Sequence, residues 1–342
     1  MCKRIMAAQT NTEGGVPFYK IGTIGGKADA YISKDLFDEY KMKYSFPHKG
    51  EVMITCAGTV GKCIIYNGED SYYQDSNIVW IDNPNEIISN DFLYHLLSKI
   101  NWSHLNSTTI VRIYNDDLRN LKLYYPHHDE QKKITHLFQL INERIATQNK
   151  IIEDLKKLKS AIRKRIFTSL KNEHTENYEI NQLLAYEQPS AYIVANDEYS
   201  ADTTLTPVLT ANKGFVLGYT DEDFGIYQKG ECIIFDDFTM DAKYVSFPFK
   251  VKSSAIKILT AKLNVNLRFM FEYLSYLGLK SEEHKRHYIS EIASLVIELP
   301  SKEKQNRIAN LMTSLDNKLA LEEKVKAKYE DKKQYLLSQM FI

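Results

Sequence analysis

The sequence is poor in the residues that mark several common protein classes. It has 4 cysteines and 2 tryptophans among 342 residues. The cysteines form no C-x-x-C pair and no zinc spacing, which predicts reduced thiols and a cytoplasmic location. No apolar run approaches the ~20 residues needed to span a bilayer. The N-terminus also has no hydrophobic stretch long enough for a secretory signal. We therefore expect a protein that neither crosses a membrane nor is secreted.

The chain also lacks net charge, since 44 Lys+Arg balance 44 Asp+Glu. This excludes a globally basic nucleic-acid binder, although not a locally basic one. The charge is unevenly distributed: 129–174 carries +5 and 301–342 carries +3, whereas 175–300 carries −7. The two basic stretches contain neither Gly nor Pro. Alternation of a globular and a basic stretch, seen twice, suggests an internal repeat.

The repeat is visible at a spacing of 174 residues. Tyr125-Pro126 followed by Asp129-Glu130-Gln131 recurs as Leu299-Pro300 followed by Glu303-Lys304-Gln305. Each proline closes a globular segment, and the acidic residue after it favours a helix start. Apolar residues then recur at alternating steps of four and three, which is the coiled-coil pattern. We expect two long helices, ~60 Å for 130–170 at 1.5 Å per residue, packed against each other and antiparallel.

The seam of this pattern defines a predicted helix-pair core. Its members are Ile134, Phe138, Ile141, Ile145, Ile152, Leu155, Ile162, Ile166, Ile308, Met312, Leu315, Leu319, Tyr329, Leu336 and Met340. Gln148 and Lys159 interrupt the first copy, and Glu322 and Lys333 interrupt the second at the same spacing; Lys326 is a further break in the second copy alone. Such breaks are either solvated positions or polar residues that set the register of the helices.

The globular segments correspond less closely. Lys49-Gly50-Glu51 matches Lys229-Gly230-Glu231, each a turn that leads into an apolar strand. Further strands are expected at 63–66, 77–81, 243–247 and 255–260, and helices at 90–99 and 266–277. The predicted fold class is α+β (mixed α/β), with two tandem domains each followed by a long helix. The predicted segments are 1–128, 129–174, 175–300 and 301–342.

The first domain differs from the second at two places. It has about ten extra residues between Pro17 and Lys49, relative to Pro207 and Lys229. Aligning Pro17 with Pro207 places Met1 opposite Ala191. We therefore expect the first domain to lack a counterpart of roughly 175–190.

Catalytic motifs are weakly represented. Gly58-Thr59-Val60-Gly61-Lys62 superficially resembles a phosphate loop, but Cys56 replaces its first glycine and Cys63 its magnesium-binding hydroxyl. A glycine-rich turn between strands is the better interpretation. His127-His128-Asp129-Glu130 could suggest a metal or nuclease site, but acidic residues are expected at a helix start. No Pro-Pro dipeptide or G-x-G-x-x-G occurs. We expect no catalysis and no metal site in this chain.

Residues suited to DNA contacts are better represented. Arg112 stands beside Tyr114, and Arg286 beside Tyr288, at equivalent places of the two domains. Arginine can pair with guanine or hold a phosphate, and amide or hydroxyl side chains in turns can bond to base edges. Alternatively, the Arg and Tyr pair with local acids, and the turn residues are ordinary loop residues. The DNA-binding candidates are Lys20, Lys27, Thr59, Lys62, Tyr73, Gln74, Asn77, Arg112, Tyr114, Thr210, Asn212, Lys213, Thr239, Lys243, Lys285, Arg286, His287 and Tyr288.

The tandem plan resembles the specificity (S) subunit of type I restriction-modification systems. The most specific features are the two junctions at 126–134 and 300–308 with their helices. Pro17-Phe18-Tyr19-Lys20, with Lys49-Gly50-Glu51, is similar to that family's target recognition domain. The resemblance covers essentially the whole chain.

The resemblance implies a non-catalytic subunit that recognises DNA. Each domain would read one half of a bipartite sequence, and the helices would set the spacer between the halves. Two methyltransferase (M) subunits would dock on the chain and modify adenine N6, and restriction (R) subunits would complete the complex. S-adenosylmethionine, ATP and magnesium would belong to those partners, so this chain would bind no cofactor.

Two alternatives stay open. The chain could be a cytoplasmic coiled-coil scaffold that binds protein partners. The missing opening of the first domain also leaves open a shortened or silent copy of the specificity subunit.

Overall fold

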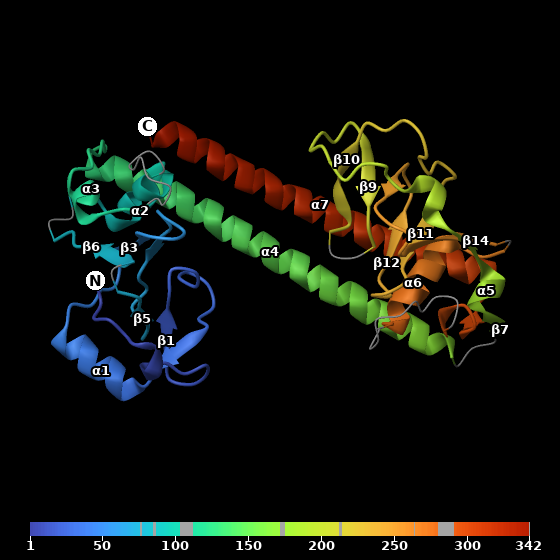
Figure 1. The fold of residues 1–342 in the computed structure, drawn as a ribbon, viewed down its shortest axis with the longest axis horizontal. Coiled ribbons are helices and arrows are strands. Elements are labelled where there is room, and N and C mark those ends of the chain that lie inside the picture. Colours follow the sequence, from blue (N-terminus) through green and yellow to red (C-terminus); the bar gives the residue numbers. More distant parts are fainter. Residues whose placement is uncertain are drawn as a thin grey trace. The chain divides into compact units, whose positions relative to one another are not determined.

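The computed structural model describes residues 1–75, 77–84, 87–102, 112–171, 175–211, 214–262, 264–279 and 291–341. The chain divides into two compact units (Figure 1). Unit 1 comprises Met1–Asn149 and Val325–Ile342, and unit 2 comprises Lys150–Lys324. Each unit therefore contains one mixed α/β domain and one part of each long helix.

Unit 1 contains two three-stranded sheets, ordered β2-β1-β5 and β4-β3-β6. Its strands are β1 (Val16–Tyr19), β2 (Ala30–Ile32), β3 (Val52–Thr55), β4 (Cys63–Ile65), β5 (Tyr72–Tyr73) and β6 (Ile78–Ile81). Its short helices are α1 (Lys34–Lys43), α2 (Asn90–Lys99) and α3 (Asn115–Arg119), with a 3-10 turn at Ala7–Gln9. Helix α1 lies between Pro17 and Lys49, so it accounts for the extra residues there.

Unit 2 repeats this topology and adds to it. The sheet β10-β9-β13 corresponds to β2-β1-β5, and β12-β11-β14 corresponds to β4-β3-β6. In both units the central strand of the first sheet has one antiparallel and one parallel neighbour. Strand β8 extends the second sheet, and β7 pairs with β15. The mixed α/β fold in two copies is thus confirmed.

The bounds in unit 2 are as follows. The strands are β7 (Glu176–Glu179), β8 (Leu184–Glu187), β9 (Thr206–Leu209), β10 (Val216–Thr220), β11 (Cys232–Asp236), β12 (Ala242–Val245), β13 (Lys250–Val251), β14 (Ile256–Ala261) and β15 (Val296–Leu299). The helices are α5 (Ile180–Leu183) and α6 (Leu267–Leu277), with a 3-10 turn at Pro189–Tyr192. Helices α2 and α6 confirm the predicted helices at 90–99 and 266–277.

A buried glutamine ties each long helix to the domain before it. Gln131 Oε1 accepts from the Ser89 N–H at 2.8 Å, and its Nε2 donates to the Pro126 carbonyl at 3.0 Å. Gln305 makes the same two bonds, with the Asn266 N–H at 2.9 Å and the Pro300 carbonyl at 2.9 Å. Ser89 and Asn266 are the N-caps of α2 and α6. The repeated Pro-x-x-x-x-Gln spacing therefore encodes one joint, used twice.

Helices α4 (His128–Leu170) and α7 (Lys302–Met340) contact each other in both units. In unit 1, Arg144 Nε donates to Tyr329 Oη at 3.3 Å. In unit 2, Lys156 Nζ lies 3.0 Å from Glu323 Oε1 and Lys159 Nζ lies 2.5 Å from Asp316 Oδ1. The partner's number falls along α7 as the residue number rises along α4, so the helices run antiparallel.

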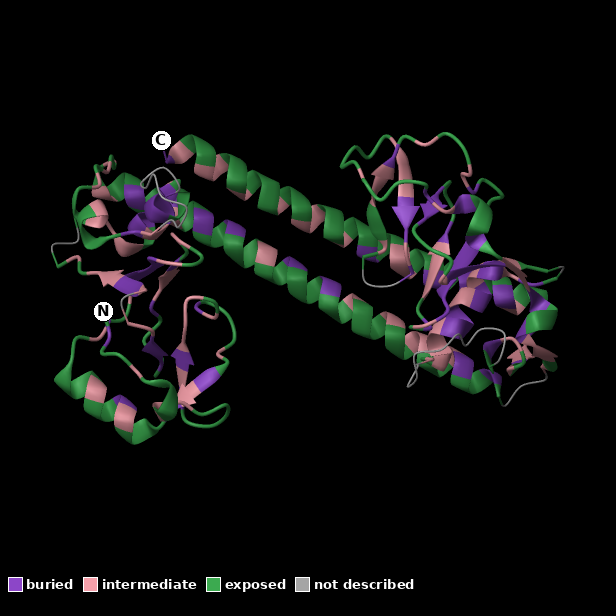
Figure 2. Cartoon of the chain, in the orientation of Figure 1, coloured by how far each residue is buried: buried purple, intermediate pink, exposed green. Residues whose placement is uncertain are grey.

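Buried and half-buried positions recur among exposed ones along both long helices (Figure 2). The seam residues Ile134, Phe138, Ile141, Ile152, Ile308, Met312 and Leu319 are buried, whereas Ile145, Leu155, Ile162, Ile166, Leu315, Tyr329, Leu336 and Met340 are half-buried. Among the polar interruptions, Gln148 is 2% exposed. Lys159, Glu322, Lys326 and Lys333 are half-buried. These polar residues therefore lie on the seam and not on the solvated face.

Candidate nucleic-acid interface

Three connecting segments of unit 1 meet at one surface. They are the loop 20–27 after β1, the turn 57–62 between β3 and β4, and residues 74, 75 and 77 between β5 and β6. Lys62 Nζ donates to the Ile24 carbonyl at 2.5 Å, and Gln74 Oε1 accepts from the Ile21 N–H at 3.2 Å. These bonds join the turn and the third segment to the loop.

The backbone of Cys56 brings a fourth segment to the same place. Its N–H donates to the Asn77 carbonyl at 2.7 Å, and its carbonyl accepts from the Ile113 N–H at 2.9 Å. Arg112 and Tyr114 flank Ile113, and the Arg112 guanidinium lies 5.8 Å from the centroid of the Tyr114 ring. Tyr114 is 58% exposed. We call the residues 20–27, 57–62, 74–75, 77 and 112–114 the turn surface of unit 1.

The turn 57–62 has glycine at two positions where the backbone has a positive φ and neighbouring side chains leave no room for a Cβ. Gly58 and Gly61 have φ of +66° and +82°. A Cβ on Gly61 would lie 2.1 Å from Trp102 Cδ1, and one on Gly58 would lie 2.6 Å from Ile21 Cδ1. The segment connects antiparallel strands, which confirms the interpretation as a turn between strands. Burial raises the pKa of the Cys56 thiol to about 11 and that of Cys63 to about 12, so both thiols stay protonated near neutral pH.

Unit 2 repeats the backbone bonds that organise this surface. The Lys252 N–H donates to the Leu209 carbonyl at 3.2 Å, as the Gln74 N–H donates to the Tyr19 carbonyl at 2.9 Å. The Asp237 N–H donates to the Ala255 carbonyl at 2.9 Å, as Cys56 does to Asn77. Thr210 and the turn 237–241 are thereby brought beside 252–255. These segments form the turn surface of unit 2.

The candidate side chains differ in their access to solvent. Lys27, Thr59 and Thr239 are exposed, and Lys20, Gln74, Asn77, Arg112, Thr210 and Lys243 are half-buried. Lys20 pairs with Asp29 at 3.1 Å. Tyr73 is 4% exposed, with its ring stacked on Tyr19 and its hydroxyl 2.8 Å from Ser71 Oγ. We therefore leave Tyr73 out of the turn surface. Asn212, Lys213, Lys285, Arg286, His287 and Tyr288 lie outside the described residues.

Two lysines of unit 2 form buried ion pairs. Lys250, 0% exposed, has its Nζ 2.5 Å from Glu222 Oε2 and donates to the Phe224 carbonyl at 2.7 Å. Lys257, 1% exposed, lies 3.4 Å from Asp237 Oδ2. The cations of these pairs are not available to phosphates. Because each of these lysines is paired with a carboxylate, the two pairs do not offset the balance of −7 over 175–300.

Lys252 is a candidate that sequence reasoning missed. It is exposed and follows β13 as Gln74 follows β5. Tyr72-Tyr73-Gln74 and Lys250-Val251-Lys252 share no residue, so only the common pairing of β5 and β13 relates them. Strand pairing, which depends on the tertiary fold, supplies the missing signal.

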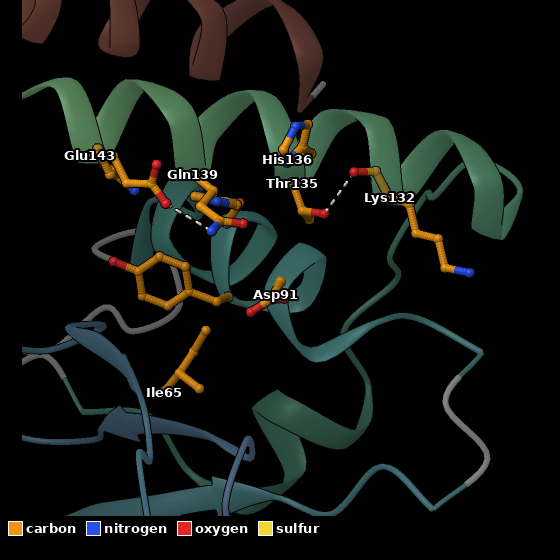
Figure 3. A pocket seen from close by; sticks show the side chains of 10 residues that line it. Ile65, Asp91, Lys132, Thr135, His136, Gln139 and Glu143 are labelled. Carbon is orange, nitrogen blue, oxygen red and sulfur yellow. Dashed lines mark hydrogen bonds between the residues drawn. The ribbon is translucent and has the colours of Figure 1, made fainter.

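A pocket of about 440 Å³ lies between α2 and α4 in unit 1. Asp91, His136 and Glu143 line it, and Gln139 Nε2 donates to Glu143 Oε1 at 2.9 Å, while Lys132 extends away from both (Figure 3). Within the described part of the chain, no three His, Cys, Asp or Glu side chains are grouped as metal ligands would be. The helices among those same residues include none both long and apolar enough to cross a bilayer.

Two like modules, each presenting strand-connecting turns that carry polar side chains, define a tandem recognition protein. Residues 1–157 and 167–330 match the family model described as the type I restriction modification DNA specificity domain. The chain therefore belongs to that family of specificity subunits.

Individual relatives agree with the family. The chain is 52% identical over 134 residues to a type I restriction enzyme specificity subunit of Haemophilus influenzae and 43% identical over 127 residues to one of Escherichia coli. These matches cover 39% and 35% of this chain but only 35% and 31% of those relatives. A specificity subunit of Methanocaldococcus jannaschii is 24% identical, with 98% of this chain and 88% of the relative covered.

Solved structures share the fold. The S subunit of a type I restriction-modification system from M. genitalium matches with a TM-score of 0.61 at 15% identity, covering 100% of this chain and 92% of that one. A structure from a study of type I complex assembly and conformational transition matches with a TM-score of 0.57 at 12% identity, covering 96% and 92%. At these identities the likeness concerns the fold.

Proposed function

We propose that this chain is the non-catalytic DNA-recognition subunit of a type I restriction-modification complex. Each turn surface reads one half of a bipartite double-stranded site from the major groove. Two methyltransferase subunits dock on the chain, restriction subunits join through the complex, and S-adenosylmethionine, ATP and magnesium are bound by those partners in the cytoplasm. The observation that carries the proposal is the occurrence of the same turn surface in both units.

The chemistry of the turn surface suits DNA better than an apolar partner. In unit 1, Lys20 and Lys27 supply phosphate contacts, Gln74 and Asn77 carry amides that bond to base edges, and Arg112 can take a guanine in a bidentate pair. Strand-connecting turns hold these groups on a folded scaffold, so little ordering is needed on binding.

The negative charge balance of unit 2 limits how it can bind DNA. The balance of −7 over 175–300 opposes nonspecific attraction to phosphates. We infer that the exposed Lys252, with Thr239 on the neighbouring turn and Lys243 on β12, provides a local cationic face. The docked methyltransferases add the remaining phosphate contacts.

Helices α4 and α7 act as the spacer. They pack antiparallel in each unit, and the same Pro-Gln joint anchors each helix to its domain. Changing the length of 135–168 by one helical turn should therefore change the preferred spacer between the half-sites, as half-site spacing follows protein geometry in other DNA readers. An unchanged spacer would contradict this role.

Mapping genomic N6-methyladenine with and without the gene tests the proposal directly. We expect a bipartite motif that disappears with the gene. An unchanged methylome in a strain with active methyltransferase subunits would favour a protein-binding scaffold or a silent copy.

Variants of the assembled complex separate phosphate contacts from base reading. Lys27→Ala should weaken binding to cognate and random DNA alike and reduce the salt slope by about 1. Lys43→Ala, on α1 and outside the turn surface, is the matched control. Arg112→Ala should weaken cognate binding more than random binding, as should Arg286→Ala; equal losses on both DNAs would assign the arginine to a phosphate.

A further inference from the structure

A buried ion pair lies next to the turn surface of unit 2. Asp237 opens the turn 237–241 that follows β11, and Lys257 stands on the neighbouring strand β14. Each residue is 1% exposed, and Lys257 Nζ lies 3.4 Å from Asp237 Oδ2. The pair therefore joins the turn that carries the exposed Thr239 to the strand that directly follows 252–255.

Further contacts fix both members of the pair. The Asp237 N–H donates to the Ala255 carbonyl at 2.9 Å. Lys257 Nζ donates to Gln188 Oε1 at 3.3 Å and lies 5.5 Å from the centroid of the Tyr186 ring. The ammonium group is thus surrounded by a carboxylate, an amide oxygen and an aromatic ring, which determine its position from several sides.

The shape of the turn itself depends on its own residues. Asp236 Oδ1 accepts from the Phe238 and Thr239 N–H groups at 2.9 Å each. The Met240 N–H donates to the Asp236 carbonyl at 2.9 Å, and Met240 has a φ of +59° and belongs to the core of the unit. Internal bonds therefore shape the turn, and the buried ion pair ties the shaped turn to β14.

Unit 1 has an apolar pair at the equivalent place. The N–H of Asp237 donates to the carbonyl two residues before Lys257. In the same way, the N–H of Cys56 donates to the carbonyl two residues before Val79. Cys56 and Val79 are 3% and 7% exposed and belong to one apolar cluster. Apolar packing therefore suffices to fold the module at this place, so folding alone does not require the ion pair of unit 2.

A buried ion pair is better suited to fixing orientation than to adding stability. Taking two charges out of water costs about as much free energy as their attraction returns, so apolar residues of similar volume often replace such a pair without loss. The attraction nevertheless depends on the separation and alignment of the two groups. The pair in unit 2 therefore favours one placement of the turn over others.

We propose that Asp237 and Lys257 are positioning residues for the DNA half-site read by unit 2, an inference that rests on the proposed function. The pair holds the turn 237–241 against β14, so Thr239 and Lys252 keep a fixed placement relative to each other on the turn surface. Base reading requires this, because a side chain displaced by about 1 Å loses its hydrogen bond to a base edge. Neither member of the pair contacts DNA.

The test uses the assembled complex with the double variant Asp237→Asn and Lys257→Met, which removes both charges and keeps similar volumes. Discrimination is measured as the ratio of binding to the cognate site and to sites with one base changed in either half. We expect discrimination at the half-site read by unit 2 to fall by about tenfold or more. Discrimination at the half-site read by unit 1, and binding to random DNA, should stay at the wild-type level.

The other buried pair of unit 2 provides a matched control. Lys250 pairs with Glu222, which follows β10. Strand β10 ends opposite Thr206, the first residue of β9, whereas the turn surface follows the last residue of that strand. Glu222→Gln with Lys250→Met therefore removes the same two charges away from the turn surface. We expect this control to keep wild-type discrimination at both half-sites, whatever its effect on the free energy of unfolding.

A second double variant guards against a simple folding defect. Asp237→Cys with Lys257→Val copies the pair that unit 1 uses, and it should show the same loss of discrimination at one half-site. Failure of both Asp237–Lys257 double variants to fold would show that the pair is needed for stability and would overturn the proposal.

The remaining outcomes are distinct. Unchanged discrimination, equal losses at both half-sites, or an equal loss in the Glu222–Lys250 control would each overturn the positioning role. The proposed function would survive these results, because the wild-type complex would still discriminate at two half-sites. A wild-type complex that does not discriminate at two half-sites would overturn the proposed function and the positioning role together.

Discussion

Units 1 and 2 attach equivalent helices, α2 and α6, to the long helices by different kinds of contact. In unit 1, His95 of α2 lies among aromatic rings, with its ring centroid 4.7 Å from Phe138 and 5.7 Å from Phe341. At the equivalent place of α6, 177 residues later, unit 2 has Glu272. This carboxylate is 0% exposed and contacts Lys159, Arg163 and Arg268.

The difference shows that the repeat conserves backbone geometry more closely than side-chain chemistry. In both units the glutamine bonds to the N-cap N–H of the domain helix and to the carbonyl of the preceding proline. The space between the helices is filled by aromatic packing in one unit and by an ionic network in the other. A buried ion pair adds little net stability over apolar packing, but loss of one partner leaves the others uncompensated.

The largest expected effect is on the ionic network. Glu272→Ala would leave three cations without their shared carboxylate and should lower the free energy of unfolding by about 3–5 kcal/mol. Chemical denaturation followed by circular dichroism measures this change. Lys156→Ala removes the exposed pair with Glu323 and is the matched control, with an expected loss below about 1 kcal/mol. Similar losses in the free energy of unfolding for the two variants would show that the buried network is no more important for stability than an exposed ion pair.

A smaller effect is expected at the shared joint, and it should be the same in both units. Gln131→Ala and Gln305→Ala each leave a half-buried helix N-cap N–H and a proline carbonyl without their glutamine partner, at a cost of about 1–3 kcal/mol. The two glutamines share no partner, so the double variant should show the sum of the two losses. A large loss for one and none for the other would refute the equivalence of the joints.

An effect of similar size depends on pH and concerns unit 1. Burial, with a contribution from the Lys333 charge, lowers the pKa of His95 to about 4. The unfolded chain therefore binds a proton more readily than the folded chain between about pH 6.5 and 4. Stability should fall by about 2 kcal/mol as the pH drops from 7 to 5.

The matching variant is His95→Leu, which keeps an apolar contact and removes the titrating group. Denaturation at pH 7 and pH 5 should show a smaller pH-dependent loss for this variant than for the wild-type chain. An identical loss in both proteins would place the acid sensitivity elsewhere.

Much of the architecture was predictable because it depends on local and periodic features. The 4-3 spacing from Ile134 to Ile166 requires a helix with one apolar side, and Pro126 with Asp129 indicates where it begins. The glycines of Lys49-Gly50 and Lys229-Gly230 have nearly equal φ, +93° and +91°, as expected for one turn used twice. Phe167 and Phe341 were missed because they leave the seam to pack on α6 and α2.

The candidate interface was predictable only in part. Arg112, Lys27 and Gln74 were found from residue type and place in turns, and the fold brings their segments together. Tyr73 could not be separated from them, because its direction depends on the pairing of β5 with β1. Lys252 could not be added, because its equivalence to Gln74 depends on the pairing of β13 with β9.

The sequence by itself determined the repeat, the two long helices and the positions of their joints, since these follow from short-range spacing of apolar, proline and glutamine residues. The tertiary structure alone decided which turns share a surface and which lysines form buried ion pairs. Those features depend on contacts between residues far apart in the chain, and local periodicity carries no information about such contacts.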